Sequence, residues 1–192
     1  MYWDKNIETL KPKELQDLQF KRLKKTLGLV QNVDFYRKLL SGAGVKISAI
    51  KTLDDIQKIP FTKKQDLRDG YPFGFLAVPM KKIVRIHTTS GTTGKPTVVA
   101  YTQQDIDTWA NLIARNMTMV GVGKGDIFQN MVNYGMFTGG LGFHYGAEKI
   151  GMAVIPSATG NTKRQIEMMI DFGVTTIHCT PSYAMHLSEV AE

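Results

Sequence analysis

The chain divides near residue 80 into two regions that differ in glycine content and in the spacing of apolar residues. Residues 1–80 hold 5 glycines and residues 81–192 hold 13. The first region has the apolar spacing of short helices, whereas the second alternates β-branched runs with helical segments. Such alternation favours a parallel sheet covered by helices. We therefore predict an α/β fold in which short N-terminal helices (1–80) precede a mainly parallel sheet with flanking helices (81–192).

Four helices are expected in the first region. The longest begins at Pro12, a residue favoured in the first turn, and ends near Leu27 with Gly28 as its stop. The other three are expected over residues 33–40, from Thr52 (with Asp55 in an approximate capping box) to Pro60, and from Thr62 to Gly70.

In the second region, a Gly/Thr/Ser loop joins the first two expected strands, which predicts a hairpin. The expected strands cover residues 83–88, 97–101, 126–132, 152–155 and 175–179, and the expected helices cover 102–121, 141–150, 162–172 and a last one from Pro181. That last helix runs to Glu192 with no stop signal. We therefore expect a truncated piece of a longer protein.

Composition excludes several classes of protein. No apolar run approaches the ~20 residues that a membrane helix needs, and the first residues lack the apolar stretch of a secretory signal. Cys179 is the single cysteine, which excludes a disulfide framework and a multi-cysteine metal site. We expect a cytoplasmic protein without a membrane partner.

The net charge of +7 is concentrated in residues 1–80, which carry 15 Lys/Arg against 9 Asp/Glu. A basic region of this kind could bind nucleic acid, or it could form solvated helix faces. The lysines are interleaved with acidic and apolar residues, and no known nucleic-acid-binding signature accompanies them. We therefore favour solvated helix faces and expect no nucleic-acid partner.

The segment from His87 to Thr97 carries the strongest chemical signal. Five hydroxyl side chains, two glycines and one lysine make up the stretch from Thr88 to Lys95. Glycines let backbone N–H groups approach an anion, hydroxyls donate further hydrogen bonds, and lysine adds a positive charge. The segment is not a Walker A motif, because Thr89 stands where the first glycine should be and Pro96 follows the lysine. It predicts a phosphate-binding loop of another architecture.

A second segment, residues 133–146, follows an expected strand at the place where ligand crevices form in parallel α/β sheets. Tyr134 and Phe137 offer aromatic walls, with space beside them at Gly135, Gly139 and Gly140. From these residues alone, an aromatic pocket and a plain glycine-rich helix start whose aromatics pack in the core are equally supported. Other residues show no recognised metal spacing and are interpreted as ordinary helix or core residues: His144, His178, His186 and Cys179.

The string from Ser90 to Pro96, Ser-Gly-Thr-Thr-Gly-Lys-Pro, resembles the phosphate loop of AMP-forming acyl-CoA synthetases. Further strings narrow the resemblance to the N-terminal portion of phenylacetate–CoA ligases: residues 34–37, 59–64, 66–69, 71–74, 137–142, 144–148 and 180–183. The resemblance spans nearly the whole chain, in order. It implies that 81–192 belong to the ATP- and acid-binding large domain of an adenylate-forming enzyme, without its C-terminal remainder and lid domain.

The resemblance implies an acid–thiol ligase of aromatic acid catabolism. The parent enzyme would use ATP, Mg²⁺ and CoA to convert phenylacetate into phenylacetyl-CoA through an acyl-adenylate. The expected candidate assembly is a homodimer. The implied ATP phosphate-binding residues are Thr89, Ser90, Gly91, Thr92, Thr93, Gly94 and Lys95. The implied acid pocket comprises Tyr134, Gly135, Phe137, Thr138 and Gly139.

The catalytic lysine and the Mg²⁺-binding acidic residue of such enzymes would lie beyond this chain, so we expect no catalytic or metal-binding residue within it and no ligase activity from this piece alone. Two other functions stay open. One is an adenylating relative that uses a non-CoA acceptor, and the other is a non-catalytic nucleotide-binding module.

Overall fold

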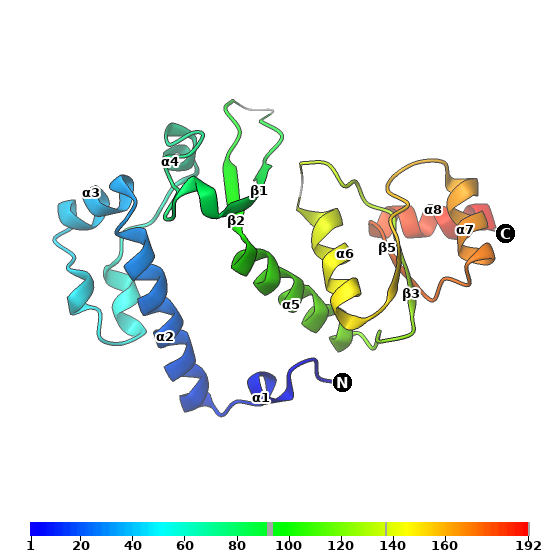
Figure 1. Ribbon diagram of the computed structural model, residues 1–192, viewed down its shortest axis with the longest axis horizontal. Coiled ribbons are helices and arrows are strands. Elements are labelled where there is room, and N and C mark those ends of the chain that lie inside the picture. The colour runs from blue at the N-terminus through cyan, green and yellow to red at the C-terminus, as the bar shows by residue number, and fades with distance from the viewer. Residues whose placement is uncertain (92–93, 137, 192) are drawn as a thin grey trace. The chain divides into compact units, whose positions relative to one another are not determined.

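A computed structural model describes residues 1–91, 94–136 and 138–191 (Figure 1). The chain forms two compact units, one of residues Asn6–Gln103 and one of Met1–Lys5 together with Gln104–Glu192. In the second unit, the Trp3 indole donates a hydrogen bond of 2.7 Å to the Asn111 side chain, which ties the chain start to that unit. The functional boundary between residues 80 and 81 stays a prediction.

The first unit consists of helices and one hairpin. Its α-helices are α2 (Pro12–Val30), α3 (Asp34–Gly42) and α4 (Lys64–Asp69), after a short α1 (Lys5–Glu8), and its 3-10 helices are η1 (Ile47–Ala49), η2 (Asp54–Lys58) and η3 (Met80–Lys82). Leu27, Val33, Leu40 and Ile50 are buried in this unit. Burial of these apolar side chains supplies the main favourable term for packing the short helices together.

Three of the helices predicted in the first region differ from those in the structure. Helix α2 continues through Gly28 to Val30, because Gly28 keeps a right-handed helical backbone conformation and glycine can adopt it. The segment that opens at Thr52 forms only the 3-10 helix η2, although Asp55 accepts the Thr52 backbone N–H at 2.9 Å as the capping box predicts.

At α4 the cap is Lys63, not Thr62. The Asp66 carboxylate accepts the Lys63 backbone N–H at 2.7 Å. The Thr62 hydroxyl instead donates to the Tyr36 hydroxyl at 3.1 Å, so a contact with α3 replaces the expected local cap.

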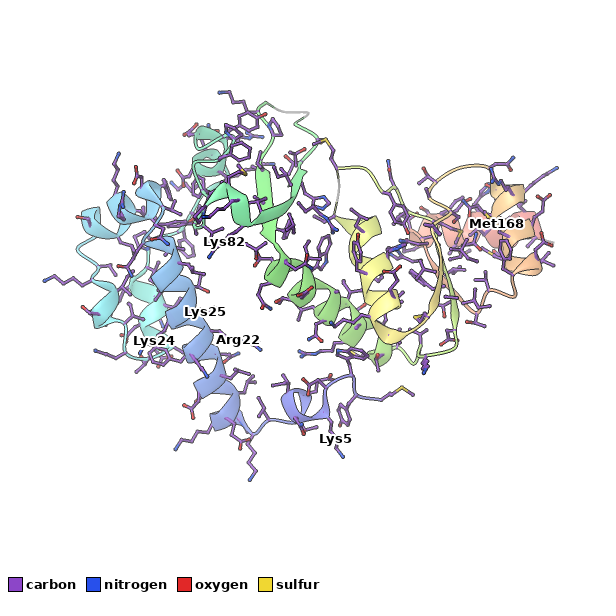
Figure 2. The ribbon with its side chains drawn as sticks, viewed as in Figure 1. Lys5, Arg22, Lys24, Lys25, Lys82 and Met168 are labelled. Carbon is purple, nitrogen blue, oxygen red and sulfur yellow. The ribbon has the colours of Figure 1, made fainter. Side chains whose placement is uncertain are left out.

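The basic side chains of α2 lie at exposed positions. Figure 2 labels Arg22, Lys24 and Lys25 on this helix, and all three are exposed. The Lys24 ammonium lies 5.6 Å from the centre of the Phe20 ring, a cation–π contact within the helix. These positions fit the solvated helix face that the charge pattern favours.

Strands β1 (Ile83–Thr88) and β2 (Val98–Thr102) form the predicted antiparallel hairpin. Their register pairs His87 with Val99 and Thr88 with Val98. The hairpin is a separate two-stranded sheet and not part of the parallel sheet. It brings the two ends of the predicted phosphate loop together.

The second unit contains a three-stranded parallel sheet in the order β4–β3–β5. Its strands are β3 (Ile127–Asn130), β4 (Ala153–Ile155) and β5 (Thr176–His178), and its helices are α5 (Gln103–Met119), α6 (Gly139–Ile150), α7 (Thr162–Asp171) and α8 (Pro181–Ala191). The core gathers Met117, Phe128, Ala147 and Met152 from four consecutive elements or their ends. The alternation of strand and helix predicted this arrangement.

Two glycines of α6 allow α5 to pack closely against it. A Cβ placed on Gly142 would lie 2.5 Å from the Trp109 ring, and one on Gly146 would lie 2.4 Å from the Ile113 side chain. Glycine costs helix stability in isolation. Here its absence of a side chain makes room for the apolar face of α5, which explains why this helix tolerates both glycines. Among the described residues, no helix has the length and apolarity required to cross a bilayer.

Gly146→Ala is predicted to destabilise the chain by about 1–3 kcal/mol, because the new methyl group meets the Ile113 side chain and the backbone of Ala114. Gly28→Ala is the matched control, since it lies inside α2 with nothing within 4 Å of the added Cβ. The control is expected to stabilise by about 0.5–1 kcal/mol. Urea unfolding of both variants measures the difference, and equal effects would contradict this packing.

Candidate functional site

The predicted phosphate loop joins β1 to β2 and contains two glycines with positive φ. Gly91 has φ +68° and Gly94 has φ +134°, and the Gly94 backbone N–H donates to the Gly91 carbonyl at 3.0 Å. These glycines turn the chain sharply where other residues would be strained. Thr92 and Thr93, between them, lie outside the described residues.

Thr89 closes the base of the loop. Its hydroxyl oxygen accepts hydrogen bonds from the Thr97 backbone N–H at 3.0 Å and from the Thr97 hydroxyl at 3.2 Å. The Thr89 backbone N–H donates to the Thr97 carbonyl at 3.0 Å. Thr89 therefore acts first as a structural residue, which its sequence position did not predict.

The loop presents donors and a positive charge beyond this closed base. Ser90, Gly94 and Lys95 are exposed there. Hydroxyl, backbone N–H and ammonium groups donate hydrogen bonds to an anion, whereas Mg²⁺ prefers oxygen ligands. The described part of the loop therefore suits phosphate oxygens better than a metal ion. Across residues 1–91, 94–136 and 138–191, no group of three His, Cys, Asp or Glu side chains is placed to hold a metal.

The second predicted segment links β3 to α6. The Asn133 side-chain oxygen accepts the Gly135 backbone N–H at 2.8 Å, which makes a tight turn. A Cβ on Gly140 would lie 2.6 Å from the Asn133 carbonyl oxygen, so only glycine fits there. Gly135, Thr138 and Gly139 are exposed, and Tyr134 is half-buried. Phe137 lies outside the described residues.

Tyr134 is held by side chains from β3 and α6. The fully buried Asn130 amide donates to the Tyr134 hydroxyl at 2.6 Å and to the Gly140 carbonyl at 2.8 Å. The hydroxyl also lies 3.2 Å from Nδ1 of His144, whose Nε2 lies 3.1 Å from the Glu148 carboxylate. Burial raises the pKa of Tyr134; the Asn130 hydrogen bond lowers it and the Glu148 charge raises it further. Tyr134 is therefore neutral at physiological pH.

The same Asn130 side chain reaches β5. Its Oδ1 atom lies 2.8 Å from Nδ1 of His178, and the His178 ring stacks on Phe143 of α6 with 3.8 Å between ring centres. Burial lowers the pKa of His178 and raises the pKa of the Cys179 thiol. Asn130 thus links β3, β5, α6 and the turn that follows β3.

A mostly apolar groove of about 580 Å³ lies at the carboxyl edge of the parallel sheet. Its lining comes from segments that follow the three strands: Met131, Val132, Asn133, Thr159, Gly160, Thr180, Ser182, Tyr183 and His186. This is the position at which open α/β sheets bind ligands. Among the described residues of the segment 133–146, only Asn133 lines this groove. Tyr134, Gly135, Thr138 and Gly139 follow it in sequence but are not part of the groove wall.

Sequence reasoning missed Asn130 and interpreted His144 and His178 as ordinary residues. The polar pair Gln129 and Asn130, between the apolar residues Phe128 and Met131, was the signal available for Asn130. His144 and Glu148 stand four residues apart, the spacing of neighbours on one helix face, which was a signal for their pairing.

The chain is 48% identical over 190 residues to the phenylacetate–coenzyme A ligase of Thermus thermophilus, covering 98% of this chain. It is 51% identical over 187 residues to that of Escherichia coli, covering 97% of this chain. The chain is a relative of the phenylacetate–coenzyme A ligases. It spans 43% of the length of each of these two proteins. No protein-family model matches it.

Solved structures of another CoA ligase are also similar to this chain. A 2-hydroxyisobutyryl-CoA ligase in complex with 2-HIB-AMP and CoA matches 99% of this chain with a TM-score of 0.91 and 30% identity, over 43% of its own length. The same ligase in its thioesterification state matches with a TM-score of 0.92 and 32% identity. The α/β fold predicted from sequence is therefore confirmed as that of CoA ligases.

Thr89→Val is predicted to destabilise the hairpin by about 1–3 kcal/mol, because it removes the acceptor of the largely buried Thr97 N–H and hydroxyl. Thr89→Ser keeps the oxygen and is expected to lose well under half as much. Hydrogen exchange of the Thr97 amide and urea unfolding provide the measurements. Equal protection of this amide in both variants would show that Thr89 does not close the loop.

Proposed function

We propose that this chain is the N-terminal portion of an AMP-forming arylacetate–CoA ligase. The observation that carries the proposal is the identity of 48–51% to phenylacetate–CoA ligases along nearly the whole chain. The closed glycine loop and the apolar groove at the sheet edge support it, since the reaction needs one site for phosphates and one for an aromatic acid. A cytoplasmic location and a homodimer remain predictions for the whole enzyme.

The proposed reaction has two steps. The aryl acid carboxylate attacks the α-phosphorus of ATP, and the bond to the bridging oxygen breaks, so that pyrophosphate leaves and an acyl-adenylate forms. The CoA thiol then loses its proton and attacks the acyl carbon, which releases AMP and leaves the thioester. Adenylation gives the carboxylate a good leaving group before the CoA thiol forms the thioester.

In this proposal the loop residues Ser90–Lys95 hold the β- and γ-phosphates. Backbone N–H groups, hydroxyls and the Lys95 ammonium would stabilise the charge that develops as pyrophosphate leaves. Mg²⁺ accompanies ATP as its counter-ion, with its protein ligands outside the described residues of this chain. The described residues bind and orient the phosphates, while the groups that complete catalysis lie outside them.

The aryl group would occupy the groove at the carboxyl edge of β3 and β5, with the segment Tyr134–Gly139 alongside. The groove volume of about 580 Å³ is in the range of small-molecule sites, and its wall is mostly apolar. Tyr183 contributes an aromatic ring to this wall. This lining favours an aromatic acid over acetate, because a larger apolar surface leaves water on binding.

We expect the full-length protein that contains this chain to release AMP from ATP in a CoA-dependent way with phenylacetate or indoleacetate, more slowly with benzoate and least with acetate. AMP and the CoA thioester are both measured by chromatography. An adenylate trapped by hydroxylamine without thioester would move the reaction to another acceptor. No AMP with any acid would favour a non-catalytic nucleotide-binding module.

Two lysine variants show whether this activity runs through the loop. Lys95→Met is expected to lower kcat/KM for ATP about ten-fold or more, since it removes one charge-assisted phosphate contact. Lys21→Met removes the same charge from exposed helix α2 and is expected to leave ATP kinetics unchanged. Equal losses in both variants would indicate general charge attraction and contradict a phosphate site at Lys95.

A further inference from the structure

One side chain of α8 connects two segments of the groove wall. Tyr183 lines the groove and is half-buried, and it begins on the α8 side, beside Ser182 and His186. Its hydroxyl lies 3.4 Å from the Gly160 carbonyl oxygen, on the loop that follows β4, and 3.3 Å from the Thr162 hydroxyl at the start of α7. Because Gly160 also lines the groove, the Tyr183 side chain bridges the α8 side of the wall and this loop.

The loop that Tyr183 contacts is held from the sheet side as well. The Ala158 backbone N–H donates to the Asn130 carbonyl at 3.0 Å, and the Ala158 carbonyl accepts from the buried Gln165 side chain at 3.0 Å. These bonds hold Ala158 at φ +56°, a left-handed conformation that is unfavourable for a residue other than glycine. The Tyr183 bridge therefore ends at Gly160 on a loop that is itself fixed in place.

The same loop borders a second cavity, of about 320 Å³. Thr159 and Gly160 line both the groove and this cavity. Much of the remaining cavity wall comes from α7, including Arg164 and Met168, of which Met168 is labelled in Figure 2. Tyr183 lines the groove and not the cavity, and its hydroxyl reaches the first residue of α7. Its ring therefore fills the path from the groove toward the start of α7.

We propose that Tyr183 is a specificity-determining residue that limits the length of the aryl group that the groove accepts. This inference rests on the part of the proposed function that places the aryl group of the acid in the groove. A single ring fits beside Tyr183, whereas a second ring joined in line meets the Tyr183 side chain between α8 and the loop. The hydroxyl contacts with Gly160 and Thr162 oppose rotation of this side chain out of the way.

Acid selectivity of the full-length protein tests this role. The measured quantity is the ratio of kcat/KM for phenylacetate to kcat/KM for biphenylacetate, in which a second ring extends the first. Tyr183→Ala removes the bridge and is expected to lower this ratio about ten-fold or more, mainly because biphenylacetate gains activity. Tyr183→Phe keeps the ring without its anchor and is expected to lower the ratio about two- to three-fold. A decrease of less than about three-fold in Tyr183→Ala would overturn the proposal.

Met185→Ala is the matched control on the same helix. Met185 is exposed, lies two residues after Tyr183 and is not among the residues that line the groove. This variant is expected to leave the ratio unchanged, and a decrease equal to that of Tyr183→Ala would indicate a general loosening of α8 and overturn the proposal. Tyr183→Leu serves as a second variant should the alanine variant fail to fold, and the same decrease in the ratio is expected in it.

Calorimetric binding of the two acids to the full-length protein, without CoA, separates this inference from the proposed function. Phenylacetate is expected to bind more tightly than biphenylacetate, and Tyr183→Ala is expected to remove this preference. That pattern in a protein that releases no AMP would refute the proposed function and leave the role of Tyr183 in place. AMP release from phenylacetate with an unchanged preference in Tyr183→Ala would refute the role of Tyr183 alone, and no binding together with no AMP would refute both.

Discussion

The buried amide of Asn130 holds together the edge of the parallel sheet at which the candidate acid site lies. It joins β3 to the start of α6 through Gly140, to β5 through His178 and to the intervening turn through Tyr134. A polar side chain with no exposed surface is stable in a core only when its hydrogen bonds are made. Asn130 makes all three of these bonds, so the segments that it joins are held in one arrangement.

Close packing of backbone against backbone completes this edge. Gly140 lies so near the Asn133 carbonyl that a methyl group would not fit, and Gly142 and Gly146 admit the apolar face of α5. The glycines of α6 thus lower its intrinsic helix propensity but allow neighbouring segments to pack closely against it. On the other unit, Gly91 and Gly94 serve a different purpose, because their positive φ angles turn the phosphate loop.

The sequence predicted the order of elements well, since the strand β1 and the helices α5 to α8 follow from local apolar period and capping. It failed where a distant contact overrides a local signal: Thr62 bonds to Tyr36 in place of capping α4, and Gly28 does not end α2. The sequence could predict a phosphate loop because its residue types carry the chemistry, and phosphate binding there stays a prediction. The links through Asn130 could not be predicted, because they join residues as far apart as 48 positions, and no local pattern specifies such pairs.

The most direct test of the role of Asn130 is the free energy of unfolding of the Asn130→Leu variant. Leucine has a similar size but removes the Asn130 partner of the Gly140 carbonyl and of His178 Nδ1, and one of the two partners of the Tyr134 hydroxyl. We predict a loss of about 3 kcal/mol or more in urea unfolding, because each unsatisfied buried group costs about 1–3 kcal/mol. A loss below about 1 kcal/mol, or a gain, would show that Asn130 does not hold this edge together.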